Sequence, residues 1–363
     1  MDSKLDDIAK PLSSGKRKTI AGLGITGLLI ALYAVYWFHL AGQLRGQVEN
    51  ETANLVEQGF QASYETLSIT GFPGDITLIL KDASIADSDG WKLGSKKIVG
   101  VLSPFNPTKV TLTLEGSLKA ALPINGRLRA FDGAADTFRA EIGLGGKATR
   151  WQGDLRVENL EMVEAKSGDV LGVNFLKVQA QANDVPDPSA QQSAYDLLIR
   201  ANDTTLPKRL SSPWGNRIKE AAFEASLMGR IPKAHSINEA LATWRDIGGT
   251  AQILRFTIDQ GPVHLTSDGT LALDGNLQPV GRAVARVSGY MEIIDALVDR
   301  KVMRSRDAPL AKMVLGTLAK RPDTGGRAVL NVPITLKNQT LYAGPIALSR
   351  LAPVKWDFLK NLM

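Results

Sequence analysis

The longest apolar stretch of the chain runs from Ile20 to Phe38 and holds 19 residues without a charge or a proline. As an α-helix rising about 1.5 Å per residue it would span about 28 Å, close to the roughly 30 Å hydrocarbon core of a bilayer. Tyr33, Tyr36 and Trp37 gather near its end, as aromatic residues do at the headgroup layer. The pattern predicts a transmembrane anchor over residues 19–38.

The flanks of this segment predict its orientation. Lys16, Arg17 and Lys18 directly precede it, whereas Arg45 is the first Lys or Arg after it. By the positive-inside rule, residues 1–18 form a cytoplasmic tail and the body that follows is exported. A cleaved signal peptide is the alternative, but its apolar core would be about 7–15 residues long and end in small residues. The bulky exit at residues 36–40 favours an uncleaved anchor.

Helical spacing continues over residues 39–58. Leu40, Leu44, Val48 and Leu55 fall within one stripe, and Gly59 is a typical stop. We expect a membrane-proximal helix that packs on the exported domain. A partner-binding coiled coil is the alternative, although barely three heptads would fit.

After Gly59 the hydrophobic period changes from 3.6 to 2, which is typical of antiparallel strands with one buried and one solvated face. Apolar and polar residues alternate over residues 75–81, 110–115, 155–158, 254–259, 263–265 and 330–337. In the fourth stretch, Leu254, Phe256 and Ile258 are expected to share one face. About fifteen strands joined largely in sequence are predicted.

Turn and helix signals punctuate the strands. Hairpin turns are expected at five Asp-Gly or Asn-Gly pairs: Asp89-Gly90, Asn125-Gly126, Asp132-Gly133, Asp268-Gly269 and Asp274-Gly275. Ser236 and Glu239 form a capping-box pattern that opens a helix to about Ile247. Two further helices are predicted over Met291–Arg304 and Leu310–Leu318.

These elements predict an α+β, β-dominated fold: an N-terminal transmembrane helix, then a long, largely antiparallel meandering sheet, curled or groove-like, with a few packing helices. The Pro-rich stretch 185–193 is a loop or a boundary. A weak division near residue 205 separates an N-terminal β region, 60–205, from a C-terminal β region with helices, 206–363. To bury its apolar face, the sheet has to curl on itself, pack against the helices or leave an apolar groove, and periodicity does not choose among the three.

The residues offer few means of catalysis. The 363-residue chain has no cysteine, which excludes disulfides, thiol chemistry and Cys-ligated metals, and His39, His235 and His264 share no metal-binding spacing. There is no GxSxG elbow. Residues 22–27 match GxGxxG but lie in the apolar segment, 145–148 lack most of a phosphate loop, and 87–90 are better explained as a turn than as a calcium loop. We predict no catalytic residues, no metal and no cofactor, and expect that the protein is not an enzyme.

Charge adds little to this picture. Lys plus Arg number 43 and Asp plus Glu number 37, a formal net charge of +6. Beyond the first 18 residues Lys and Arg are scattered among acidic residues and outnumber them by only four, too few for a nucleic-acid footprint. We therefore expect no nucleic-acid partner.

Short turn motifs carry a resemblance to a known family. They are Gly71-Phe72-Pro73, Trp91, the run Ser103 to Pro107 with Pro104, Asn106 and Pro107, the Asp274-Gly275 turn, Gly289 and Gly344-Pro345. In this order they resemble the bacterial domain-of-unknown-function family 2125, membrane-anchored envelope proteins with no assigned activity, over about residues 60–350. The resemblance implies no active-site residues. A fainter likeness of architecture links the chain to the AsmA-type envelope proteins, which are associated with lipid movement between membranes.

Together these observations predict a single-pass protein of the inner membrane of a Gram-negative bacterium, with its C-terminal body in the periplasm. Its expected partners are membrane lipids, and its sheet is expected to bind lipid or another apolar ligand in envelope maintenance. The alternative is a structural or assembly partner of an envelope protein complex. An enzyme using scattered carboxylates comes third.

Overall fold

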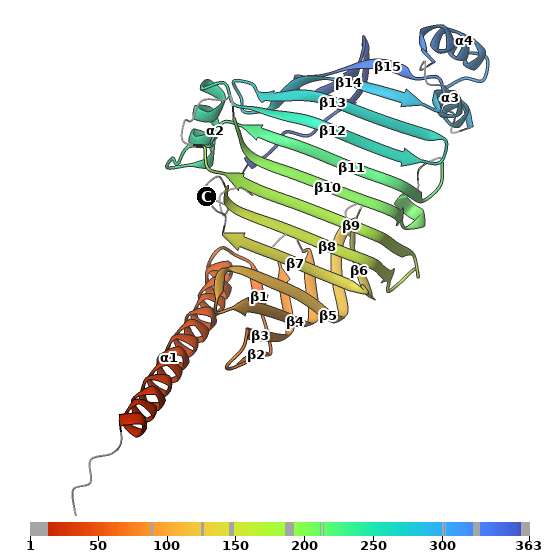
Figure 1. The fold of residues 1–363 in the computed structure, drawn as a ribbon. Coiled ribbons are helices and arrows are strands. Elements are labelled where there is room, and N and C mark those ends of the chain that lie inside the picture. The colour runs from red at the N-terminus through yellow and green to blue at the C-terminus, as the bar shows by residue number, and fades with distance from the viewer. Residues whose placement is uncertain are drawn as a thin grey trace, which may run out of the picture.

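The computed structural model describes residues 14–87, 90–124, 127–144, 149–185, 192–210, 212, 214–299, 301, 303–321 and 327–356. The side chains of residues 14–24 and of Arg209 lie outside the described set. The fold is one long helix followed by a 17-stranded antiparallel sheet, with three short helices near the sheet's rim (Figure 1).

The elements follow one another in the chain in this order: α1 (Ser14–Glu57), β1 (Gln61–Ser63), β2 (Thr66–Thr70), β3 (Ile76–Ala86), β4 (Lys92–Ser103), β5 (Asn106–Ile124), β6 (Arg127–Ala134), β7 (Thr137–Leu144), β8 (Thr149–Glu164), β9 (Val170–Asn183), β10 (Ser193–Thr205), a 3₁₀ turn (Lys208–Leu210), β11 (Arg217–Met228), α2 (Ile237–Asp246), β12 (Thr250–Gln260), β13 (Val263–Leu273), β14 (Pro279–Ser288), α3 (Tyr290–Asp299), α4 (Ala308–Leu318), β15 (Leu330–Lys337), β16 (Thr340–Ala343) and β17 (Ile346–Arg350).

The sheet is a meander, as the alternating pattern predicts. From β8 to β17 each strand pairs antiparallel with the next one in the chain. β1 and β2 both pair with β3, which pairs with β4, and β4 pairs with β5. The 19-residue strand β5 pairs with β6 along one half and with β7 along the other, and both then pair with β8. Strand directions turn progressively along the sheet (Figure 1), as the usual twist of about 20–25° per pair requires.

The anchor and the membrane-proximal helix are one continuous helix, α1, which ends at Glu57. Gly59, with φ +93°, breaks it as predicted. α1 lies at one end of the sheet, where it contacts β1 and β2 (Figure 1).

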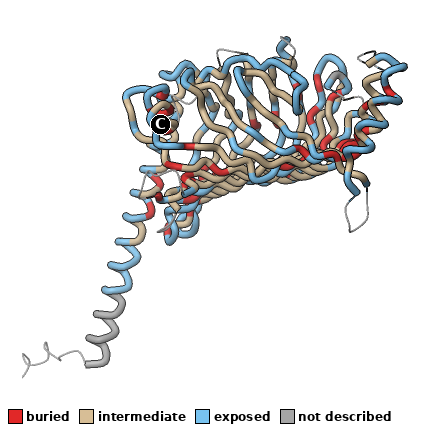
Figure 2. Tube along the Cα trace, turned by 90° about the horizontal axis from the view of Figure 1, so that it is seen from above, coloured by how far each residue is buried: buried red, intermediate tan, exposed pale blue. Residues whose placement is uncertain are grey.

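The described part of the chain forms a single layer over most of its area. The accessible surface of the whole chain is 23,315 Å², against about 14,000 Å² expected for a compact monomer of 39.1 kDa. The exposed helix α1 accounts for part of the excess. Buried residues are few and scattered, and most of the sheet is only half-buried (Figure 2). The sheet therefore has no second sheet packed across it among the described residues.

Two of the predicted turns are wrong. Asp132-Gly133 lies inside β6 and Asp268-Gly269 inside β13. A Cβ at Gly133 would sit 1.9 Å from the Glu161 carbonyl oxygen, and one at Gly269 would sit 2.5 Å from the Ala283 Cβ. These glycines let neighbouring strands approach closely. Because a close strand approach and a tight turn both require glycine, an Asp-Gly pair does not distinguish the two.

Of the other predicted turns, Asp274-Gly275 is confirmed between β13 and β14. Gly90 lies between the paired strands β3 and β4, whereas Ser88 and Asp89 are outside the described residues. Asn125 and Gly126 are also outside them, although Ile124 and Arg127 on either side pair with each other.

All three predicted C-terminal helices exist. At α2, Ser236 accepts a hydrogen bond from the Glu239 amide, as in a capping box, but the Glu239 carboxylate accepts from the His235 amide instead of returning to Ser236. α3 ends at Asp299, five residues before the predicted Arg304, and Lys301 has the left-handed φ of +59° that a continuing helix excludes. The division near residue 205 stays a prediction.

Candidate functional site

Two turns of the sheet contact α1 at the end of its apolar segment. The β2–β3 turn and the β4–β5 turn receive hydrogen bonds from aromatic side chains of the helix. Tyr36 Oη donates to the Pro104 carbonyl oxygen at 2.8 Å, Trp37 Nε1 donates to that of Gly74 at 2.8 Å, and the Tyr33 hydroxyl donates to that of Pro73. Turn carbonyls have no partner in the ladder, so these donors satisfy them.

Ring contacts complete this junction, which we call the exit collar: Tyr33, Tyr36, Trp37, Phe72 and Phe105. Phe72 meets Trp37 edge-on at 5.5 Å between centroids, and Tyr33 stacks on Phe105 at 5.8 Å. Trp37 is buried, whereas Phe105 is 83% exposed. Amphipathic rings with a buried base and an exposed tip suit the interface between hydrocarbon and water.

The two turns that meet at the exit collar contain half of the motif residues that carry the family resemblance. Gly71, Phe72 and Pro73 form the β2–β3 turn, and Pro104, Asn106 and Pro107 lie at the β4–β5 turn. Gly71 has φ +116°, and a Cβ there would lie 1.9 Å from the Asp75 carbonyl oxygen. Asn106 Oδ1 accepts from Thr108 Oγ1 at 2.8 Å. Sequence reasoning found these residues but not that the two turns meet on one helix.

The other motif residues lie elsewhere. Trp91 donates to Asp87 Oδ2 at 3.0 Å and faces the Phe60 ring just beyond α1. Gly289, with φ +78°, precedes α3 and passes close to the Pro262 carbonyl. Gly344 and Pro345 connect β16 to β17. These residues hold strand connections and converge on no common site.

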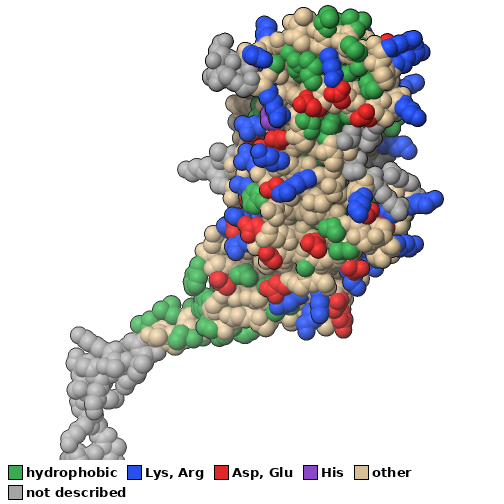
Figure 3. Space-filling view, turned by 90° about the vertical axis from the view of Figure 1, so that its right-hand side faces the viewer, with side chains coloured by type: hydrophobic (Ala, Val, Ile, Leu, Met, Phe, Trp, Pro, Cys, Tyr) green, Lys and Arg blue, Asp and Glu red, His purple; other side chains and the backbone are tan. Residues whose placement is uncertain are grey.

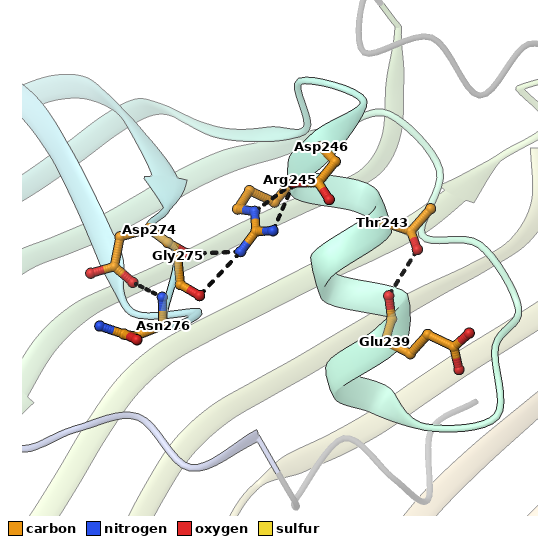
Figure 4. A network of polar contacts seen from close by, with 7 residues as sticks. All are labelled: Glu239, Thr243, Arg245, Asp246, Asp274, Gly275 and Asn276. Carbon is orange, nitrogen blue, oxygen red and sulfur yellow. Dashed lines mark hydrogen bonds and ion pairs between the residues drawn. The ribbon is translucent and has the colours of Figure 1, made fainter.

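The Asp274-Gly275 turn is fixed by a polar network with α2 (Figure 4). Arg245 Nη1 donates to the carbonyl oxygens of Asp274 at 3.2 Å and Gly275 at 3.4 Å, and its guanidinium pairs with Asp246 at 2.7 Å. Asp274 Oδ1 accepts from the amides of Asn276 and Gln278, each at 2.8 Å. The network attaches α2 to the β13–β14 turn and contains no free reactive group.

One face of the sheet is apolar across ten strands. Cross-strand pairing places one residue of each strand from β2 to β12, β6 excepted, in a continuous row, which we call the apolar row: Ile69, Leu78, Gly100, Leu112, Ala140, Leu155, Val178, Ile199, Phe223 and Phe256. At about 4.8 Å per strand the row is about 40 Å long. No periodicity within a single strand could reveal it.

The apolar row begins beneath α1. Ile76 and Leu102 share the face of Leu78 and Gly100, since side chains two residues apart in a strand point the same way. Both pack with Trp37 and Ala41 of α1, and Ile69 and Val110 lie against the same cluster. Farther along the face, half-buried side chains have no helix over them among the contacts that join the described elements. A second small core, Leu118, Phe131 and Met162, lies where β5, β6 and β8 meet.

The opposite face is polar. Neighbouring positions on β5 to β12 form the row Thr111, Glu141, Asp154, Gln179, Leu198, Glu224 and Arg255. A hollow of about 680 Å³ lies on this face. Lys109 at 2.6 Å and Arg139 at 2.8 Å bind the Glu141 carboxylate and lower its pKa. The polar side chains thus pair with one another.

Asp196 is the most strongly bound carboxylate of this hollow. Partial burial by itself raises its pKa, but hydrogen bonds donated by Ser193, Ser226, Gln181 and Asn183, at 2.5–2.9 Å, outweigh that effect. The net result lowers the pKa from 3.8 to about 2. A carboxylate kept ionised by four donors is a structural anchor and is poorly suited to accept a proton near neutral pH.

A β-bulge corrects one predicted face. Between Ile253 and Phe256 the register of β12 shifts against both neighbours. Ile253 therefore takes the apolar position, and Leu254 lines the polar hollow with about half of its side chain exposed. Phe256 and Ile258 keep the predicted apolar face. The bulge breaks the period-2 rule on which the prediction depended.

The predicted topology residues cannot be assigned a contact, and the three histidine residues do not come together in a site. The backbone of Lys16, Arg17 and Lys18 is in α1, and their side chains lie outside the described set. His39 is exposed, His235 is fully exposed, and His264 Nδ1 lies 3.7 Å from Asp259. In the part of the chain that the structure describes, no three His, Asp or Glu residues are grouped as metal ligands.

Taken together, the fold defines a single-sheet β protein on an N-terminal apolar helix. Among the described helices, one stretch, Ile25–Glu57 of α1, is long and apolar enough to cross a membrane and suggests a single-pass anchor. The model of a family described as "Uncharacterized protein conserved in bacteria (DUF2125)" matches residues 37–352, most of the chain, and the chain belongs to this family. Neither a curated protein nor a solved structure matches.

Proposed function

We propose that this protein is a non-enzymatic, membrane-anchored envelope protein whose sheet binds the acyl chains of lipids, or another apolar ligand, along the apolar row. The observation that carries the proposal is the row itself: ten apolar or glycine positions in register on a sheet that is one layer thick. Covering apolar surface releases about 25 cal/mol per Å². An acyl chain would supply the second layer that the described chain does not.

The start of the row supports a lipid as the ligand. Its first residue, Ile69, packs against the cluster that Trp37 and Ala41 of α1 form with the sheet, so the apolar face continues from the apolar surface of the anchor. A chain drawn from the bilayer would reach the row without crossing a polar surface. We place the anchor in the inner membrane, with residues 1–18 in the cytoplasm and the sheet in the periplasm, because Lys16, Arg17 and Lys18 precede the apolar segment.

Binding of a pyrene-labelled fatty acid to the full-length protein, held in amphipol, tests the proposal. Phe223→Asp or Phe256→Asp places a carboxylate at the end of the row farthest from α1. We expect affinity to fall roughly tenfold or more, because an unpaired charge would have to be buried. Leu198→Asp is the matched control, since Leu198 lies next to Ile199 on the opposite face.

Circular dichroism is the control for folding, and each variant is expected to keep the β-sheet spectrum of the parent. Equal affinity for Phe223→Asp and the parent, or a greater loss in Leu198→Asp, would contradict the assignment to the apolar row. A reporter fused to the C-terminus tests the orientation: periplasmic alkaline phosphatase activity is expected, and cytoplasmic fluorescence of a green fluorescent protein fusion would overturn it.

A second candidate, an assembly partner of an envelope protein complex, is favoured by the edge strand β17. Its only described partner is β16, and all five of its residues are exposed, Ile346 and Leu348 among them. An unpaired edge accepts a strand from another chain. In-cell crosslinking from residue 348 would then trap one dominant partner, whereas a uniformly uncrosslinked chain would exclude it.

A further inference from the structure

The helix α4 carries apolar side chains on two opposite sides. One side faces the protein, where α4 contacts α3 and β15, and holds the buried or half-buried residues Ala308, Ala311 and Leu315. The other side faces outward and holds the exposed residues Leu310 (65%), Met313 (69%), Val314 (47%) and Leu318 (61%). Their i, i+3, i+4 and i+8 spacing puts these four on one stripe, which we call the α4 stripe.

Positive charge surrounds the α4 stripe. Residues 300–327 contain eight Lys or Arg and two Asp, so this segment carries a formal charge of +6, equal to that of the whole chain. Lys301, Arg304, Arg306, Lys320 and Arg321 are exposed around the helix. Figure 3 shows hydrophobic side chains at this end of the molecule, with Lys and Arg around them and a few Asp and Glu beside them. Asp295 of α3 pairs with Lys312 of α4. The rest of the chain is formally neutral, so the basic excess is concentrated here.

The described ends of the chain lie away from the stripe. The last described residue, Trp356, donates to the Leu277 carbonyl at the start of β14, and α4 follows the opposite end of that strand. α1, the first described element, lies at the other end of the sheet (Figure 1).

We propose that α4 docks on the anionic surface of a second lipid bilayer, opposite the one that α1 anchors in. The α4 stripe enters the headgroup layer, and the surrounding Lys and Arg side chains contact acidic headgroups, as in interfacial amphipathic helices. Eleven strand steps separate β3, near α1, from β15, beside α4, about 50 Å along the sheet. Because the two contacts lie at opposite ends of the sheet, the protein spans between two membranes. The inference rests on the anchor but not on ligand binding to the apolar row.

Vesicle tethering tests this. The full-length protein is reconstituted in phosphatidylcholine vesicles and mixed with labelled acceptor vesicles of phosphatidylcholine, with or without phosphatidylglycerol. We expect clustering, followed by light scattering, only with phosphatidylglycerol and decreasing as salt rises. The triple variant Leu310→Asp, Met313→Asp and Leu318→Asp should cluster at least tenfold less. Leu128→Asp, at a comparably exposed residue (57%) on β6, should cluster as the parent does.

Three outcomes would overturn the proposal. Equal clustering by the triple variant and the parent would show that the α4 stripe does not dock on the acceptor vesicles. Equal clustering of neutral and anionic acceptors would show that the Lys and Arg side chains do not recognise acidic headgroups. Loss of self-association in the triple variant, by sedimentation, with unchanged tethering would assign the stripe to a second copy of the chain. Binding of the pyrene-labelled fatty acid is expected to be unaffected, so failure here is separable from failure of the apolar row.

Discussion

Near the membrane, the apolar face of the sheet is covered by the chain itself: Ile76 on β3 lies beneath α1 with 0% of its surface exposed. Farther along the same face, Ile142 on β7 is 49% exposed. The two side chains are identical, and pairing through β5 and β4 puts them on one surface. What differs is the helix above one of them and the open surface above the other.

The apolar pattern of the strands is the same in both regions, but only the region near the membrane has a helix packed over its apolar face. A strand in which apolar and polar residues alternate is predicted to have one buried face. The alternation does not predict which element or ligand covers that face. Here α1 covers the first strands, and we propose that a ligand covers the middle. The contrast between the two regions can be measured residue by residue.

The largest expected effect is at the covered end. Trp37→Ala should lower the free energy of unfolding by about 3–5 kcal/mol, since it empties a buried site and removes the hydrogen bond to Gly74. Urea unfolding of the full chain in detergent measures this. Trp151→Ala, at an exposed tryptophan on β8, is the control and should cost clearly less. Equal losses would remove the distinction between the two regions.

The sharpest form of the comparison uses the two isoleucines. Ile76→Ala should cost about 2–5 kcal/mol because its cavity is enclosed by α1, whereas Ile142→Ala removes a half-exposed side chain and should cost less than about 1 kcal/mol. The same denaturant titration compares the pair. Similar values for the two would show that the middle of the apolar face is covered in the unliganded protein.

The polar face should be complete without a ligand. Asp196→Asn weakens four hydrogen bonds to a carboxylate and should cost about 1.5–3 kcal/mol. Because the folded pKa is lowered from 3.8 to about 2, the carboxylate stabilises the fold above pH 3.8, and this contribution is lost as the pH falls from 3.8 towards 2. Unfolding midpoints of parent and variant should therefore converge at low pH.

Asp203→Asn is the control for that series. Asp203 pairs with Arg217 at 2.9 Å on an exposed surface, and asparagine tolerates its positive φ of 48°. A loss below about 1 kcal/mol is expected. If its pH dependence matched that of Asp196→Asn, the Asp196 network would not be the cause.

The smallest effect is expected at the rim. Arg245→Ala removes the hydrogen bonds from α2 to the Asp274-Gly275 turn and should cost about 0.5–1.5 kcal/mol. Hydrogen exchange should accelerate at residues 274–278 and not at the exit collar. Faster exchange at both places would mean that the rim and the collar unfold together.

The sequence was sufficient for the elements and insufficient for their assembly. Period-2 runs predict β3, β5, β8, β12, β13 and β15 correctly, and the uncharged stretch predicts the helix, because both signals depend on residues near one another in the chain. Gly133 and Gly269 were misassigned because a close strand approach and a turn both require glycine. Leu254 was misplaced because a bulge depends on the neighbouring strands.

The candidate site was harder to predict. The motif residues Phe72 and Pro104 were recognised, but their meeting around Tyr33 and Trp37 depends on how two turns pack on one helix. The apolar row depends on cross-strand register, which single-strand patterns leave open. The exposed side of α4 was not recognised either, because its apolar spacing resembles that of a packing helix.

Photocrosslinking from neighbouring positions of β10 tests the central claim most directly. A photoreactive amino acid is placed at Ile199, on the apolar row, or at Leu198, one residue away on the polar face. After irradiation of living cells, the protein is purified and its adducts are identified by mass spectrometry. We predict lipid adducts from position 199 and none from position 198. Equal labelling at both positions, or lipid only at 198, would contradict the account.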